Sequence, residues 1–458
     1  MKQNNRSLTQ GNILNALIKM ALPIMGTSFL QMAYNLTDMI WIGRIGSSSV
    51  AAVGTAGFYM WLSFSLIIIS KTGAEVLVAQ GIGSQRYKDA RNAARSALQL
   101  NILLALLYGA LILIFKEPLI DFFKIEDPAV NAMAISYLSV IGYGMIFMFC
   151  PPVFSAIFNG SGDSKTPFRI NTVGLVTNMI LDPLLIFGLG PIPAMGVKGA
   201  AIATIASQAI VTIVFLIELQ TNKTPFGHVN FLRRPNSQHI KRIVKIGIPT
   251  AFNSALFTFF SMVIARIIAQ WGPLPIAVQK VGSQIESISW MTASGFSVAI
   301  SAFFGQNYGA GIWERLWKGY FTSFKIAIAL GIFNTLLLVL GAGPIFSIFI
   351  PESEAIRLGV DYLQILGLSQ LFMCIEITTS GAFSGLGKTL PPSIVSIIFN
   401  AMRIPMALYL SQPHILGLNG VWWSITISSV FKGVILVIWY HFHINKYPEI
   451  QAYRQETS

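Results

Sequence analysis

About twelve long apolar runs constrain the fold of this chain more than any motif does. A helix needs about 20 mainly apolar residues to cross the hydrocarbon core of a bilayer. Only 11% of the 458 residues are charged and 54% are hydrophobic, whereas soluble domains carry about 25% charge. We therefore predict an all-α integral membrane protein with twelve transmembrane helices. The predicted spans are roughly 16–42, 51–80, 93–115, 130–158, 168–189, 197–219, 243–270, 276–305, 319–343, 356–384, 392–411 and 417–441.

Lysine and arginine are distributed unequally between the two sets of connections that these spans create. One set, which includes the segment before residue 243 and the C-terminal NKYPEIQAYR, holds 17 basic residues, and the other set holds 5. Short cytoplasmic loops carry the excess of positive charge in membrane proteins. We predict a multi-pass protein of the plasma (inner) membrane with both termini in the cytoplasm. The net charge of +13 then reflects orientation and contact with membrane lipids, and no nucleic-acid partner is expected.

The second half of the chain repeats the first at an offset of about 225 residues. LIKMALP (17–23) returns as IVKIGIP (243–249), and FNGSGDSKTP (158–167) returns as FSGLGKTLPP (383–392). Each half has an even number of spans, so the halves share one orientation and a pseudo-two-fold axis along the membrane normal relates them. The repeat alone suits a transporter, a channel or a scaffold. The predicted domains are an N-terminal six-helix bundle (1–220), a cytoplasmic linker (221–242), a C-terminal six-helix bundle (243–445) and a cytoplasmic tail (446–458).

Two aspartates lie inside apolar spans of the first half, and the second half has no aspartate at the matching positions. Asp38, in YNLTDMIWIGR, aligns with Ile264, and Asp182, in NMILDPLLIF, aligns with Ile404. Ionisable groups within the membrane are costly and indicate function by default. A second interpretation places Asp38 at the headgroup boundary close to Arg44.

Several oxygen donors accompany Asp182 in the sequence. Asn178 stands one helical turn before it, Pro183 frees a backbone carbonyl beside it, and Thr204 follows on the next span. Together with Asp38, this set suits H⁺ or Na⁺ as a coupling ion. Close carboxylates in low dielectric repel one another, which favours protonation of one of them. In a purely structural alternative, Asp182 caps backbone groups around a kink at Pro183.

The second half carries different intramembrane charges. We predict a polar network of Glu376, Arg266 and Arg403. It could contact the substrate or serve the structure, and the sequence favours neither role. The segment SGLGKTLPP resembles a phosphate-binding loop, but Ala382 stands where that motif needs glycine. The two cysteines lie in apolar runs and behave as small hydrophobes. We therefore expect no ATPase or other enzyme activity and no cofactor.

The motifs YNLTDMIWIGRIG, FNGSGDSKTP and NMILDP, together with the twelve spans, resemble the multidrug and toxic compound extrusion (MATE) transporters, most closely their DNA-damage-inducible F branch. The resemblance implies an N-lobe cation site at Asp38, Asn178, Asp182 and Thr204. It also implies a bend at Pro23. By the same resemblance, the neighbouring substrate cavity contains Gln31, Tyr34 and Asn159.

These features predict a secondary active multidrug efflux antiporter that works by alternating access. It is expected to act as a monomer and to export lipophilic, cationic small molecules in exchange for H⁺ or Na⁺. One alternative is a flippase for lipid-linked saccharides, which would favour an arginine-rich site. Another is a non-transporting membrane scaffold or channel, which would not need acids in one bundle only.

Overall fold

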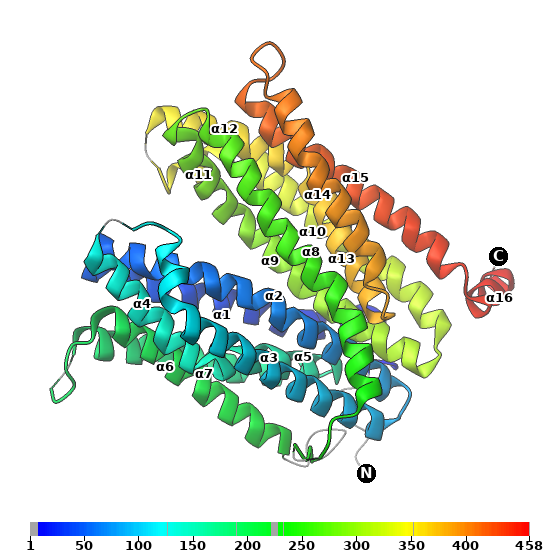
Figure 1. The fold of residues 1–458 in the computed structure, drawn as a ribbon. Coiled ribbons are helices and arrows are strands. Elements are labelled where there is room, and N and C mark those ends of the chain that lie inside the picture. The colour runs from blue at the N-terminus through cyan, green and yellow to red at the C-terminus, as the bar shows by residue number, and fades with distance from the viewer. Residues whose placement is uncertain are drawn as a thin grey trace. The chain divides into compact units, whose positions relative to one another are not determined.

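A computed structural model describes residues 8–125, 127–188, 190–220, 228–231, 233–350 and 352–457. This part of the chain consists of α-helices and connections, with no β-strand (Figure 1). The helices are α1 (Ile13–Ile45), α2 (Ser47–Gly83), α3 (Tyr87–Asp121), α4 (Pro128–Tyr143), α5 (Met145–Gly160), α6 (Lys165–Phe187), α7 (Gly196–Gln220), α8 (Ser237–Ala269), α9 (Pro273–Ala310), α10 (Trp313–Leu340), α11 (Ala342–Ser347), α12 (Ser353–Gly367), α13 (Gln370–Gly385), α14 (Leu390–Leu410), α15 (Leu418–Ile444) and α16 (Pro448–Thr457).

The helices account for the predicted membrane spans. Among the described residues, 10 helices are long and apolar enough to cross a membrane, and two bent helix pairs bring the number to 12. Helices satisfy their backbone groups internally, which a hydrocarbon environment requires. The all-α fold class with twelve spans is confirmed. The C-terminal tail contains the short helix α16.

Two of the predicted spans are broken rather than continuous. The run at 130–158 divides into α4 and α5, which meet at Gly144 with a bend of 55°, and the run at 356–384 divides into α12 and α13 with a bend of 46°. A side chain at Gly144 would collide with Ile205 of α7, so the backbone comes too close to its neighbour for any larger residue. The second break, at Leu368 and Ser369, falls at the matching place in the sequence repeat.

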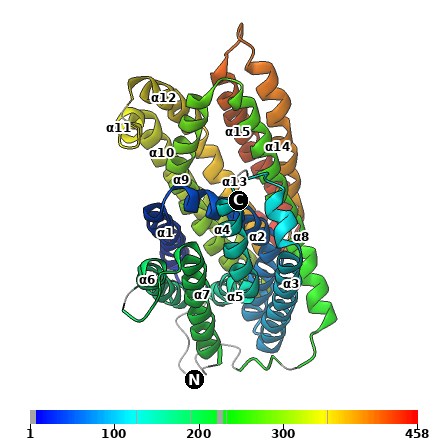
Figure 2. The same ribbon diagram turned by 60° about the vertical axis from the view of Figure 1, so that its left-hand side comes forward.

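The chain forms two compact units, and the first contains Leu22–Ile248. Within it, α2 packs against α3 and α5, and α6 lies beside α7 (Figures 1 and 2). The start of α8 also belongs to this unit. A Cβ atom on Gly73 of α2 would lie 2.7 Å from the Cα atom of Ile243, so only glycine permits this crossing. Small residues of this kind are the usual contacts between membrane helices.

The second unit contains Pro249–Ser458 together with Leu8–Ala21 at the start of the chain. Leu8 is buried, and its backbone N–H donates to the side-chain oxygen of Gln306 at 3.0 Å. Arg315 of α10 donates to the carbonyl oxygens of Gly11 at 2.7 Å and of Leu8 at 3.1 Å. These bonds fix the segment that leads into α1 to α9 and α10.

The first helix of each half of the repeat, α1 or α8, therefore passes from one unit to the other close to a proline. The change falls between Ala21 and Leu22 in α1, before Pro23, and between Ile248 and Pro249 in α8. These bounds differ from those of the predicted lobes, which meet at the 221–242 linker. Residues 221–227 and 232 of that linker lie outside the described part of the chain. The division into functional lobes stays a prediction.

Candidate functional site

The part of α1 beyond Pro23 supplies two side chains to the first unit. Tyr34 and Asp38 are four residues apart, so they project from the same side of the helix. Tyr34 is buried and Asp38 is partly buried, with its Oδ1 atom fully covered. The Arg44 guanidinium lies over the ring of Trp41 at 4.8 Å, which gives Arg44 a different neighbour from the one proposed in the headgroup-boundary interpretation.

Helix α6 supplies the second acid with a fixed partner. Asn178 and Asp182 are both fully buried, and the Asn178 Nδ2 donates to Asp182 Oδ1 at 3.0 Å. Pro183 follows directly and lacks the N–H that would bind the carbonyl oxygen of Met179, so that oxygen has no helical partner. The carboxylate is thus held by an amide on its own helix, which leaves its second oxygen uncommitted.

Five buried oxygen atoms of this region have no hydrogen-bond partner in the described part of the chain: Tyr34 Oη, Asp38 Oδ1, Asn178 Oδ1, Asp182 Oδ2 and Thr204 Oγ1. Tyr34 lies beside Thr204 of α7 and within reach of the charges of both acids, which also act on each other. Buried polar atoms are normally satisfied, so a cluster of unsatisfied ones needs an explanation. Hard oxygen ligands of this kind suit a proton or Na⁺. We call these five residues the acid cluster.

Tyr137 is a member of this region that the sequence analysis missed. It lies in α4, is buried, and is within reach of the charges of Asp38 and Asp182, while its hydroxyl faces the sulfur of Met60 at 3.9 Å. The repeat contained a signal, because ISYLSVIGYG aligns Tyr137 with Tyr362 in VDYLQILGLS. No pattern in the sequence showed which way either tyrosine points.

The second unit holds a buried polar cluster of its own. The Tyr362 hydroxyl donates to Glu286 Oε2 at 2.8 Å, and Gln370 Nε2 donates to Glu286 Oε1 at 3.1 Å. Arg403 donates to the hydroxyls of Ser428 at 2.7 Å and Ser429 at 3.2 Å. The charges of Glu286 and Arg403 act on each other.

A buried ion pair completes this second cluster. Lys432 Nζ lies 3.0 Å from Glu376 Oε2, and both side chains are nearly inaccessible. The structure brings Glu376 and Arg403 near one another and adds Glu286 and Lys432, which the predicted network did not include. Arg266 is exposed near the end of α8 and makes no part of this buried cluster. Two acids and two bases balance one another here, whereas the only charged side chains of the acid cluster are its two carboxylates.

The remaining predicted residues lie at other levels of the first unit. Gln31 is exposed, one turn before Tyr34 on α1. Asn159 is buried near the end of α5, and its side-chain oxygen is unpaired among the described residues. Asn159 precedes the start of α6, whereas Asp182 lies about 26 Å along that helix, so the two are well separated. Pro23 lies within α1, where the chain changes unit.

A protein-family model described as MatE matches the chain twice, over residues 23–184 and 249–409. The chain belongs to the MatE family. The two matches begin at Pro23 and Pro249, which confirms the repeat found in the sequence. MatE proteins are multidrug and toxic compound extrusion transporters rather than enzymes, and this one is a multi-pass membrane protein.

Relatives of this MatE protein match it over nearly its whole length. The "Probable multidrug resistance protein NorM" of Thermotoga maritima is 30% identical, covering 93% of this chain and 91% of its own. The "Probable multidrug resistance protein YoeA" of Bacillus subtilis is 26% identical, covering 92% of each chain. A crystal structure of MATE in complex with MaD5 has a TM-score of 0.89 at 23% identity, covering 97% of this chain and 99% of its own. That likeness supports the fold.

Among the described residues, no group of three or more His, Cys, Asp or Glu side chains is placed to hold a metal ion. A bound Na⁺ would therefore depend on the mixed set of the acid cluster, which has two carboxylates, one amide and two hydroxyls. Each of its unpaired oxygens is an acceptor for a hard cation.

Proposed function

We propose that this MatE protein is a secondary active multidrug efflux antiporter. It exports lipophilic, cationic small molecules in exchange for H⁺ or Na⁺ by alternating access. The observation that carries the proposal is the acid cluster, in which two carboxylates and three further oxygens are buried without partners among the described residues. The names of its relatives, which are multidrug resistance proteins, support the substrate class.

The chemistry of the acid cluster explains how exchange would arise. Two carboxylates in poorly solvated surroundings need positive charge, which a proton, a sodium ion or a cationic compound can supply. Because each ion that binds removes the need for the other, occupation by the coupling ion favours release of the compound. The hydrogen bond from Asn178 fixes Asp182, so Asp38 on α1 is the acid whose surroundings change when α1 moves.

We also propose the orientation with both termini in the cytoplasm and a location in the plasma membrane. The unequal distribution of basic residues, 17 against 5, supports this orientation. The pair of acids supports membership in the DNA-damage-inducible F branch. A monomeric state stays a prediction.

Efflux of a fluorescent cationic dye from proteoliposomes tests the proposal. The wild type is expected to move the dye under an imposed pH gradient or an imposed Na⁺ gradient, and not without one. Asp38→Asn and Asp182→Asn are each expected to abolish gradient-driven efflux, because an amide carries no charge for the coupling ion to neutralise. The gradient that works identifies the ion.

Asp121→Asn is the matched control. Asp121 is an acid of the same unit at the end of α3, where its exposed carboxylate accepts a hydrogen bond from Asn131 at 3.0 Å. Its replacement should leave efflux unchanged. Gradient-driven efflux that survives both Asp38→Asn and Asp182→Asn would show that the acid cluster is not the coupling site.

The flippase alternative gains no support from the arginines. Arg266 is exposed, and Arg403 is engaged with Ser428 and Ser429 beside two acids. A pyrophosphate group would have to displace these neighbours before it could pair with the guanidinium. Transport by neither gradient, combined with movement of a lipid-linked saccharide, would nevertheless favour the flippase.

A further inference from the structure

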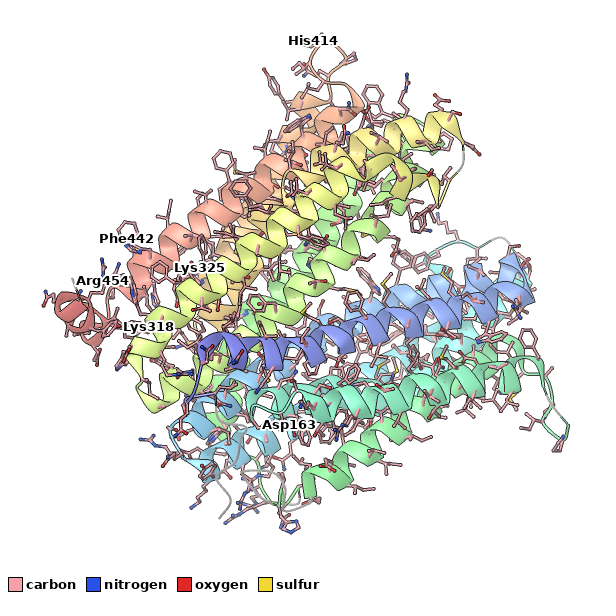
Figure 3. All side chains as sticks on the ribbon, turned by 180° about the vertical axis from the view of Figure 1, so that it is seen from behind. Asp163, Lys318, Lys325, His414, Phe442 and Arg454 are labelled. Atoms are coloured by element: carbon pink, nitrogen blue, oxygen red, sulfur yellow. The ribbon has the colours of Figure 1, made fainter. Side chains whose placement is uncertain are left out.

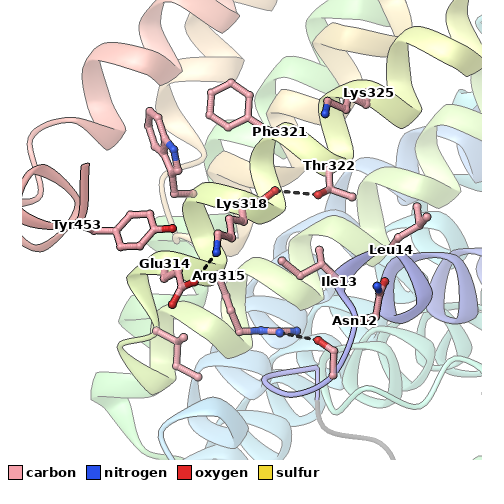
Figure 4. A pocket seen from close by; sticks show the side chains of 13 residues that line it. Asn12, Ile13, Leu14, Glu314, Arg315, Lys318, Phe321, Thr322, Lys325 and Tyr453 are labelled. Atoms are coloured by element: carbon pink, nitrogen blue, oxygen red, sulfur yellow. Dashed lines mark hydrogen bonds and ion pairs between the residues drawn. The ribbon is translucent and has the colours of Figure 1, made fainter. Parts of the chain in front are cut away.

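A cavity of about 800 Å³ opens at the beginning of α10, away from both polar clusters. Its walls come from three elements of the second unit: the first turns of α1, one side of α10 and Tyr453 of α16 (Figure 4). We call it the α10 pocket. The family relationship assigns no role to it, and it is independent of the acids of the first unit.

Positive charge exceeds negative charge in this pocket. Its lining contains three cations, Arg315, Lys318 and Lys325, against the single carboxylate of Glu314. Arg315 is occupied by the carbonyl oxygens of the N-terminal segment, and Lys318 Nζ lies 2.5 Å from Glu314 Oε1. Lys325 has no hydrogen-bond or ion-pair partner within the described residues (Figure 4).

The position of Lys325 along α10 makes this charge unusual. Lys318 and Lys325 follow one another on the same side of the helix, two turns apart (Figure 3). Lys325 stands about 18 Å from the helix start, inside a segment that is apolar enough to span the membrane. Cations at such depth are costly unless they reach water, the lipid headgroups or an anion. The pocket provides the path by which this ammonium meets one of them.

The same pocket has an apolar and aromatic wall. Trp317 and Phe321 of α10 and Leu14 of α1 line it, and Phe321 and Leu14 expose more than a third of their surface. Lys318 Nζ also lies 5.8 Å from the ring centre of Tyr453. Aromatic side chains with a polar edge are typical of the membrane interface. A ligand for this pocket therefore has an anionic head and an apolar body.

We infer that the α10 pocket binds one anionic phospholipid, with the phosphate of its headgroup between Lys318 and Lys325 and an acyl chain along Phe321. A phosphate oxygen accepts hydrogen bonds from both ammonium groups and neutralises the excess charge. Polar contact from Asn12 and Thr322 is available to the glycerol part of the headgroup. A free phosphate ion would use the lysines but not the apolar wall.

Native mass spectrometry of the purified full-length protein, titrated with phosphatidylglycerol, tests the inference. We expect the first phosphatidylglycerol molecule to bind more tightly than the later ones. It should also bind more tightly than a molecule of phosphatidylcholine. Lys325→Gln and Lys318→Gln should each weaken this first binding about fivefold, since a basic residue at the membrane surface contributes about that factor. Lys325→Arg should bind the first lipid about as tightly as the wild type, because the positive charge is kept.

Lys388→Gln is the matched control, an exposed lysine of the same unit at the connection between α13 and α14. It should bind phosphatidylglycerol as the wild type does. Equal weakening by Lys388→Gln, or unchanged binding by both Lys318→Gln and Lys325→Gln, would overturn the inference. Competition by glycerol 3-phosphate at the same concentration would assign the site to a soluble phosphate instead. None of these results depends on dye efflux, so the inference and the proposed function fail separately.

Discussion

Lys432 and Glu376 form a buried ion pair in the polar interior of the second unit. Both side chains are buried, and their charged atoms are 3.0 Å apart. Removal of one partner leaves an uncompensated buried charge, which costs about 3 to 5 kcal/mol, whereas replacement of both by apolar residues is often nearly neutral. We expect Lys432→Met to lower the melting temperature in detergent, and the double variant Lys432→Met with Glu376→Leu to recover most of the loss. Thermal unfolding followed by tryptophan fluorescence would give the melting temperatures of both variants. A double variant no more stable than Lys432→Met would contradict the pairing.

The two tyrosines that the repeat aligns provide a second test at this scale. Tyr362 donates a hydrogen bond of 2.8 Å to Glu286, whereas Tyr137 has only a long contact of 3.9 Å with a sulfur atom. Loss of a hydrogen bond to a charged group costs about 1.5 to 3 kcal/mol. Tyr362→Phe should therefore destabilise the protein clearly, and Tyr137→Phe should change its stability little. Thermal unfolding of both variants side by side would decide, and equal losses would contradict the difference in bonding.

Sequence reasoning succeeded at this scale where partners are local. Asn178 and Asp182 lie one turn apart on one helix, so their contact follows from helix geometry alone. Lys432 and Glu376 lie on different helices. The sequence of an apolar helix does not show which side of that helix faces the protein and which side faces lipid. Tyr137 escaped notice for the same reason. The exposed position of Arg266 also needed the packing of α8 to be known.

At the scale of elements, the break between α4 and α5 falls at a single small residue, Gly144. The apolar run predicted one continuous span, because glycine inside a hydrophobic run carries no clear signal, and the obstacle to a larger residue is Ile205 on another helix. Overpacking of this kind costs about 1 to 3 kcal/mol. We expect Gly144→Ala to lower the melting temperature, whereas Gly57→Ala in α2 should not, since no atom lies within 4 Å of the added carbon there. Comparable losses in the two variants would argue against the contact.

Pro23 and Pro249 give the long first helices their points of weakness. Each stands where its helix passes from one compact unit to the other, and each removes a hydrogen bond from the helix interior. We predict that Pro23→Ala raises thermal stability while it slows dye efflux, because the restored bond resists bending. Stability and efflux measured on the same preparation would test both effects. Faster efflux together with higher stability would contradict a hinge at this residue.

At the scale of the whole molecule, the proposed topology predicts which connections are reached from outside the cell. Both native cysteines are buried, so they should not react with a membrane-impermeant maleimide. Ser48→Cys at the start of α2 should be labelled in intact cells, and Lys88→Cys at the start of α3 only after the membrane is opened. Both positions are exposed in the structure. The reverse pattern would invert the topology.

The twelve spans, the repeat and the family were accessible from sequence because they rest on composition and on self-similarity, which need no three-dimensional information. The bounds of the two units were not. The sequence placed the change at a polar linker, yet Leu8–Ala21 joins the second unit through backbone bonds to Arg315 and Gln306. A polar linker is visible in a sequence, whereas an exchange of helix ends depends on contacts between residues about 300 positions apart.

This exchange has a consequence for biosynthesis. The first unit lacks its last element until the ribosome has made residue 248, and the earliest segment of the second unit, Leu8–Ala21, finds its partners only when α9 and the start of α10 have been made. Neither half of the gene would then encode a self-sufficient product. Two fragments divided within 221–227 would have to be produced together and meet in the same membrane before either could complete its fold.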